Sequence, residues 1–217
     1  LLTGLFLFTV FGLLAVLVGS LMPVGTVLIL DQPSSPLGLR DTLRRSFRLL
    51  VPLSFSLLLG GVLAFGGFFV FILPAIIFQF FFLFTTYEVV LGGRRYGAAL
   101  RRSYYLVEHH FRGIFFRLLP FWLISFTGGV FIPDLVRRID PQLGGVISFL
   151  LGILLSWYGM AFTLTLYKQV QAASEPETER SLRWVGVISL SGWLIFIVLV
   201  VVAIQAIVAA LRRGAGK

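Results

Sequence analysis

The side chains that could carry chemistry are few, and the most conspicuous of them is a carboxylate. Glu88 is the one acidic residue close to the interior of an apolar segment. A carboxylate in that setting either marks a proton pathway or is satisfied by water and nearby cations. Arg94 and Arg95 are candidate partners in the following loop, and Arg117, one turn inside a later apolar segment, is another. Glu88 and Arg117 are therefore a candidate intramembrane polar pair.

The remaining reactive residue types do not form a recognisable catalytic or metal-binding set. His109 and His110 are adjacent, so on a helix their side chains point about 100° apart and cannot chelate one metal from one face. The chain has no cysteine, which excludes disulfides and thiolate sites. Phosphate-loop, HExxH and GxSxG motifs are also absent from the sequence. We therefore predict no catalytic residues, no metal, no cofactor and no enzymatic activity.

Composition identifies the environment in which these residues work. Of 217 residues, 58% are hydrophobic and 12% are charged, whereas soluble domains carry about 25% charged residues. This composition predicts an integral membrane protein. The formal net charge of +9 would suggest nucleic acid in a soluble protein, but in a membrane protein it indicates basic loops beside an anionic leaflet. We therefore expect membrane lipids, and no nucleic acid, as partners.

Apolar runs of about 20 residues predict the membrane-spanning helices. Because these runs are continuous and do not alternate, they exclude a β-barrel. We predict an all-α polytopic bundle that forms a single transmembrane domain over residues 1–217. The chain starts with Leu1 rather than Met, on the side opposite the basic loops, so we expect a further segment before it. The six predicted spans cover residues 1–30, 51–71, 75–91, 113–132, 143–167 and 186–211.

The distribution of positive charge predicts the orientation. Segments 31–50, 92–112 and 168–183 fall on one side and carry twelve Lys and Arg residues, against five on the other side. Cytoplasmic loops carry the excess of basic residues. We therefore expect a multi-pass protein of the cell (inner or plasma) membrane whose three basic loops are cytoplasmic.

An internal repeat is the strongest pattern in the chain. Leu43-Arg44-Arg45-Ser46 recurs 57 residues later as Leu100-Arg101-Arg102-Ser103, and each copy precedes two apolar spans. The predicted unit is an interfacial amphipathic helix followed by a two-span hairpin. In both copies the arginine pair lies opposite an apolar face, which suits a helix in the headgroup plane. The candidates for binding lipid headgroups are Arg44, Arg45, Arg101 and Arg102, unless these residues serve only as topology signals.

The second copy also carries a family resemblance. The run Tyr87-Glu88-Val89-Val90-Leu91-Gly92-Gly93, followed by GAALRRSYYLV at residues 97–107, resembles the EALRRS-x-x-LV segment of one membrane-domain group. That group includes the membrane domain found beside glycerophosphoryl diester phosphodiesterases and the YciC-like proteins. The resemblance implies a multi-span bundle but not phosphodiesterase chemistry, which belongs to a separate soluble domain. The group often has an acidic residue where Gly92 stands here; Glu88 lies one turn earlier.

Small residues on the fifth predicted span suggest a helix-packing stripe. They recur every four residues, which places them on one helical face where a neighbouring helix can approach closely. A permeation path is the alternative function of such a stripe. Gln79, a polar residue within a span, is expected to make an interhelical hydrogen bond. The stripe consists of Gly144, Ser148, Gly152 and Ser156.

These observations lead to a non-catalytic membrane protein. We expect a scaffold or accessory subunit that engages anionic lipid and other membrane proteins. The alternative is a transporter or lipid-translocating protein, since internal repeats are common among transporters. Transporter repeats usually carry polar breaks near the middle of the membrane, and such breaks are sparse in this sequence.

Overall fold

Every regular element in the described part of the chain is helical. The computed structural model describes residues 23–31, 38–175 and 181–214. Residues 23–31 form a helix, whereas the rest of the predicted first span, residues 1–22, lies outside the described residues. The other elements are α2 (Leu39–Val70), α3 (Ile72–Phe81), α4 (Thr85–Val90), α5 (Gly97–His109), α6 (Phe111–Phe126), the π-helical turn η1 (Thr127–Phe131), α7 (Ile132–Ile139), α8 (Pro141–Ala172) and α9 (Arg183–Gly214).

In the described part of the chain, five helical segments are long and apolar enough to cross a membrane. This finding confirms the prediction of an all-α chain with membrane-length helices. The fourth and fifth predicted spans both lengthen, because α7 extends the helical path past Pro133 and α8 begins at Pro141. The five segments are Arg40–Val70, Ile72–Val90, Phe111–Ile139, Pro141–Ala172 and Arg183–Val208.

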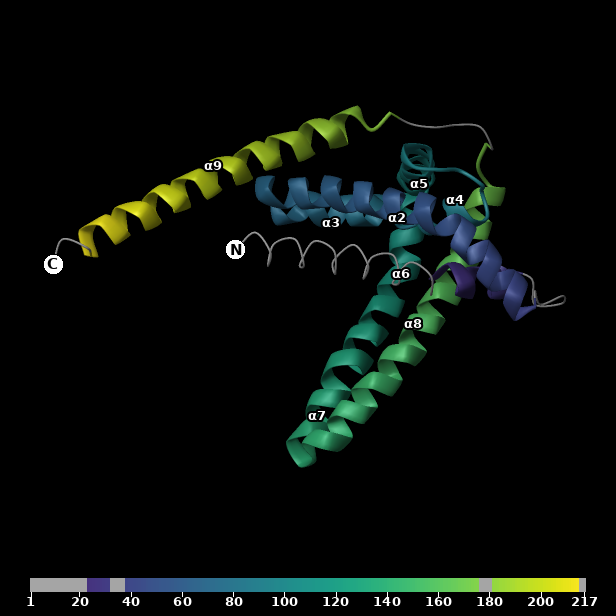
Figure 1. Cartoon of the computed structure of the whole chain (residues 1–217). Helices are drawn as coiled ribbons and strands as arrows, with labels where there is room; N and C mark the ends of the chain where they lie inside the picture. Colours follow the sequence, from purple (N-terminus) through teal and green to yellow (C-terminus); the bar gives the residue numbers. More distant parts are fainter. Residues whose placement is uncertain (1–22, 32–37, 176–180, 215–217) are drawn as a thin grey trace.

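The helices form two arms that diverge from a common junction (Figure 1). In the first arm, α2 packs along α3 and α9. In the second arm, α6, η1 and α7 run beside α8. α4 and α5 lie at the junction, where α5 contacts α2, α3, α4 and α6. The largest cluster of buried apolar side chains is centred there and includes Phe78, Phe84, Tyr104, Leu106 and Tyr167.

The two copies of the sequence repeat adopt different structures. The first Arg pair lies in α2, which continues without interruption from Leu39 to Val70 and contains Pro52. The second pair lies in α5, a separate helix that ends at His109. The first basic segment is therefore not a separate interfacial helix but the polar end of a membrane-length helix. Pro52 removes one backbone hydrogen bond from this helix but does not end it.

The third apolar segment is a broken helix. α3 begins at Ile72 and tolerates Pro74 because the first turn of a helix has no partner for that N–H group. The helix stops at Phe81, three residues turn, and α4 restarts at Thr85. α5 packs over the break. A membrane protein tolerates an interrupted helix where other protein segments bury the break.

Candidate functional site

A buried ion-pair cluster joins three helices at the junction of the two arms. Glu88 of α4 is 1% exposed, and its Oε1 accepts a hydrogen bond of 3.2 Å from the hydroxyl of Tyr167 of α8. Nε of Arg102, on α5, lies 4.0 Å from Oε1. Nε of Arg94, in the loop before α5, lies 3.4 Å from Oε2. Both carboxylate oxygens are therefore occupied, and the sequence-based pairing of Glu88 with Arg94 is present.

The loop after α4 is shaped around this carboxylate. The backbone N–H of Arg94 donates to the carbonyl of Glu88 at 3.0 Å, which turns the chain back towards α4. A Cβ atom on Gly92 would lie 2.6 Å from Oε2 of Glu88, so only glycine leaves room for the carboxylate. Gly93 has a positive φ of 66°, a conformation that glycine adopts readily. The space beside Gly92 is thus filled by the Glu88 side chain.

Arg102 is part of this cluster and not a headgroup ligand. Its side chain is 2% exposed, and its guanidinium carbon lies 5.1 Å from the centre of the Tyr105 ring. A side chain buried in this way cannot reach a lipid headgroup, so the structure corrects that prediction for Arg102. Arg44 and Arg45 are exposed and Arg101 is half-buried.

Ser103 is a structural residue that the sequence reasoning missed. Its hydroxyl donates to the carbonyl of Phe81 at 2.8 Å and accepts from the N–H of Phe84 at 3.0 Å. These are the backbone groups left open where α3 ends and α4 begins. The serine of the second repeat therefore replaces the missing helical hydrogen bonds at the break. In the sequence, the only indication of this role is that both repeats have a serine at this position, Ser46 and Ser103.

Arg117 does not pair with Glu88. Its guanidinium donates to Oε1 of Gln169 at 2.7 Å, on an exposed face of α6 and α8. Tyr167 and Gln169 are two residues apart, so they project on nearly opposite faces of α8. Tyr167 faces Glu88 and Gln169 faces Arg117, which separates the two charges that the sequence suggested as a pair.

The basic end of α2 is exposed. Its first three turns carry four arginines against one acidic residue, Asp41. All four arginine side chains are exposed, and the helix becomes apolar from Leu49 onwards. One rigid element therefore carries both a cationic end and an apolar, membrane-length body. The four residues are Arg40, Arg44, Arg45 and Arg48.

The predicted packing stripe on α8 is only partly at an interface. Gly144 is buried against Arg137, where no Cβ atom would fit. Ser148 is half-buried, Ser156 is exposed, and a Cβ atom on Gly152 would meet nothing within 4 Å. A close helix approach lies elsewhere, where a Cβ atom on Gly192 of α9 would collide with the carbonyl of Gly66 of α2.

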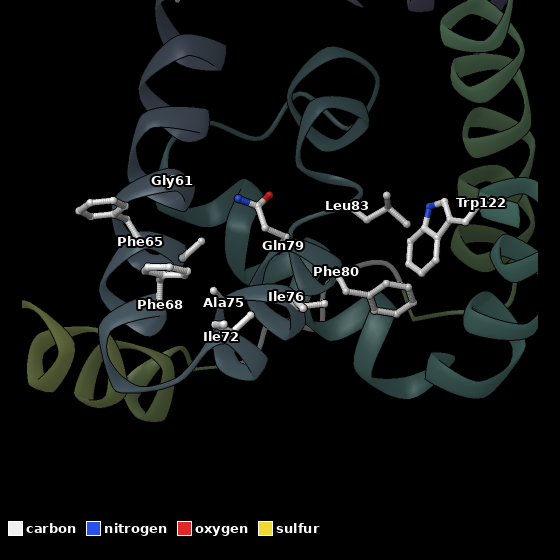
Figure 2. A pocket seen from close by; sticks show the side chains of 11 residues that line it. Gly61, Phe65, Phe68, Ile72, Ala75, Ile76, Gln79, Phe80, Leu83 and Trp122 are labelled. Carbon is white, nitrogen blue, oxygen red and sulfur yellow. The ribbon is translucent and has the colours of Figure 1, made fainter. Parts of the chain in front are cut away.

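An apolar pocket opens on the side of the first arm (Figure 2). It has a volume of about 780 Å³ and lies between α2, α3 and Trp122 of α6. Gln79 is the polar side chain of its lining, and its amide is directed into the pocket (Figure 2). The expected interhelical hydrogen bond of Gln79 is not formed with any residue in the described ranges. The lining also includes Gly61, Ala64, Phe65, Phe68, Ile72, Ala75, Ile76, Phe80 and Leu83.

The histidine pair is engaged with its own helix. Nδ1 of His109 lies 3.3 Å from the carbonyl of Tyr105, and Nδ1 of His110 lies 3.3 Å from that of Leu106. Within the described ranges, no three His, Asp or Glu side chains gather where they could hold a metal ion. Comparison with known proteins gives no match to a family profile, a curated protein or a solved structure.

Proposed function

We propose that this chain is a non-catalytic integral membrane protein that engages anionic lipid as a scaffold or accessory subunit. The observation that carries the proposal is the construction of α2. Four exposed arginines occupy its polar end, and its body is long and apolar enough to cross a membrane. A helix of this kind anchors its charges at the depth of the headgroups, where each basic residue contributes about 1 kcal/mol of attraction to an anionic leaflet.

The proposed orientation places this basic end in the cytoplasm. The excess of Lys and Arg in segments 31–50, 92–112 and 168–183 supports it. The proposed location is the cell (inner or plasma) membrane. We also propose a relationship to the YciC-like and phosphodiesterase-associated membrane domains, because the resemblance implies a multi-span helical bundle.

A structural role is favoured over catalysis by the way the polar groups are used. Glu88, Arg94, Arg102 and Tyr167 satisfy one another, which leaves no free acid or base in that cluster. The long faces of α6, α8 and α9 expose apolar side chains such as Phe149, Leu154 and Val198. In a bilayer these faces meet lipid or neighbouring membrane proteins, as a scaffold requires.

The alternative function is transport or lipid translocation. The lateral pocket of about 780 Å³ supports it, because an apolar chamber with one amide suits an apolar molecule that carries a polar group. A solute that co-purifies in stoichiometric amount would favour this alternative, whereas a stoichiometric protein subunit would favour the scaffold.

Lipid analysis tests the leading proposal. The variant R40Q/R44Q/R45Q/R48Q and the wild type are purified in a mild detergent, and the retained lipid is quantified by class. We expect a selective loss of phosphatidylglycerol and cardiolipin with zwitterionic lipid unchanged. R137Q/R138Q, on the predicted outer side, is the control and should retain the wild-type profile. An unchanged profile in a correctly inserted quadruple variant would reduce the arginines to topology signals.

A further inference from the structure

A second, smaller pocket adjoins the basic end of α2. It has a volume of about 320 Å³ and lies between α2, the helix at residues 23–31, and the end of α4. Arg45 and Arg48 of α2 line it together. They are three residues apart, so they share one face of the helix. Neither arginine has an ion-pair or hydrogen-bond partner among the described residues.

The charge balance of this pocket is positive. Its single acidic residue, Asp31, is matched by Lys168, whose Nζ lies 2.7 Å from the Asp31 carboxylate. Two guanidinium groups therefore remain without a matching anion among the residues that the structure describes. Guanidinium groups bind phosphate oxygens through paired, charge-assisted hydrogen bonds. The ligand that this arrangement favours is a phosphate ester.

Much of the remaining lining is apolar and lies towards the apolar body of α2. Leu28, Leu49 and Val90 contribute to it and belong to the small core cluster formed by the 23–31 helix, α2 and α4. Leu49 is also where α2 changes from charged to apolar sequence. A phosphate group bound by the arginines would thus lie at headgroup depth. The first methylene groups of the same lipid would contact Leu28 and Leu49.

We propose that this pocket is a binding site for one anionic glycerophospholipid. Arg45 and Arg48 hold its phosphate, and the apolar floor receives its glycerol and upper acyl chain. The inference rests on the proposed function, because it names a defined site and ligand class for a protein that engages anionic lipid. Arg40 and Arg44 lie on the same helix and are also exposed, but they do not line the pocket.

Those two arginines provide the matched control. The delipidated full chain in a mild detergent is titrated with dioctanoyl phosphatidylglycerol, and binding is followed by native mass spectrometry. Since all four arginines are exposed, both R45Q/R48Q and R40Q/R44Q should fold normally. We expect R45Q/R48Q to weaken binding about 30-fold, the loss of two basic contacts. R40Q/R44Q should weaken binding by no more than about threefold, because salt screens the attraction between these more distant surface charges and the lipid phosphate.

The remaining outcomes separate this inference from the proposed function. Equal weakening by the two variants would overturn the site and leave the general attraction of α2 for anionic lipid. No weakening by either variant would overturn both. Inorganic phosphate or sn-glycerol 3-phosphate is added as a competitor; displacement at concentrations equal to the lipid would show a soluble phosphate ligand and overturn the lipid site.

Discussion

The hydroxyl of Tyr167 donates a hydrogen bond of 3.2 Å to Glu88, 79 residues earlier in the chain. This contact ties α8 of the second arm to α4 at the junction (Figure 1). Arg102 brings α5 to the same carboxylate. The cluster therefore links α4, α5 and α8 at the junction where the two arms meet.

Replacement of Glu88 should destabilise the fold. Glu88→Gln leaves the buried guanidinium of Arg102 without its anion, and breaking a buried ion pair costs roughly 3–5 kcal/mol. The exposed pair Asp134 and Arg138, 3.1 Å apart and one helical turn apart, is the control. Asp134→Asn should cost no more than about 0.5 kcal/mol. Thermal unfolding in detergent measures both, and equal stability losses would contradict the role of the cluster.

The two repeat serines should respond differently to removal of the hydroxyl. Ser103→Ala leaves the buried N–H of Phe84 without its partner, a loss of roughly 1–3 kcal/mol. Ser46 occupies the same repeat position, but its buried hydroxyl has no hydrogen-bond partner among the described residues. Ser46→Ala should change the free energy of unfolding by less than about 0.5 kcal/mol. A larger loss of stability for Ser46→Ala than for Ser103→Ala would contradict the proposed role of the Ser103 hydroxyl.

The local sequence predicted where the helices lie better than it predicted which helices pack against one another. The apolar runs located the membrane-length segments because length and hydropathy are local properties. Arg45 and Arg102 occupy identical LRRS tetrapeptides, yet Arg45 is exposed and Arg102 is buried. The difference arises because Arg102 lies on a face of α5 that packs at the junction, whereas Arg45 lies on an exposed face of α2. Such burial depends on tertiary contacts that a repeat does not encode.

The small-residue pattern shows the same limit. Regular spacing on α8 predicted a packing stripe, but Gly152 faces open space. Gly66 and Gly192, which belong to no regular stripe, form the close crossing of α2 and α9. Spacing identifies a face on which a helix can be approached, but it does not identify which neighbour approaches.

The α2–α9 crossing gives a direct test by overpacking. Gly192→Leu must displace the carbonyl of Gly66, and such overpacking costs roughly 1–3 kcal/mol. Gly186→Leu is the matched change in the same helix, where a Cβ atom meets nothing within 4 Å. Because both changes gain the same helix propensity, the difference in unfolding temperature isolates the packing. Similar unfolding temperatures for the two variants would rule out this crossing.

Tyr96 is held in a backbone conformation that favours glycine. Its φ is 53° and its ψ is −132°, and its ring packs edge-on against Phe55 with centroids 5.3 Å apart. Tyr96→Gly and Tyr96→Ala both remove the ring, but only glycine relieves the backbone. We expect the glycine variant to be more stable than the alanine variant by about 1 kcal/mol. Chemical unfolding monitored by tryptophan fluorescence compares them; a more stable alanine variant would contradict the strain.

We propose that the three basic loops of this protein face one leaflet, the anionic cytoplasmic one. Because the chain contains no cysteine, single cysteines can be introduced without background labelling. Single-cysteine probes are placed at Ala98 and Ala173, near the basic loops, and at Gln142, in the first turn of α8. Each variant is treated with a membrane-impermeant maleimide in intact cells and in inverted vesicles. We expect Ala98→Cys and Ala173→Cys to react only in inverted vesicles and Gln142→Cys to react only in intact cells. Labelling of Ala98→Cys and Gln142→Cys from the same side would contradict this orientation.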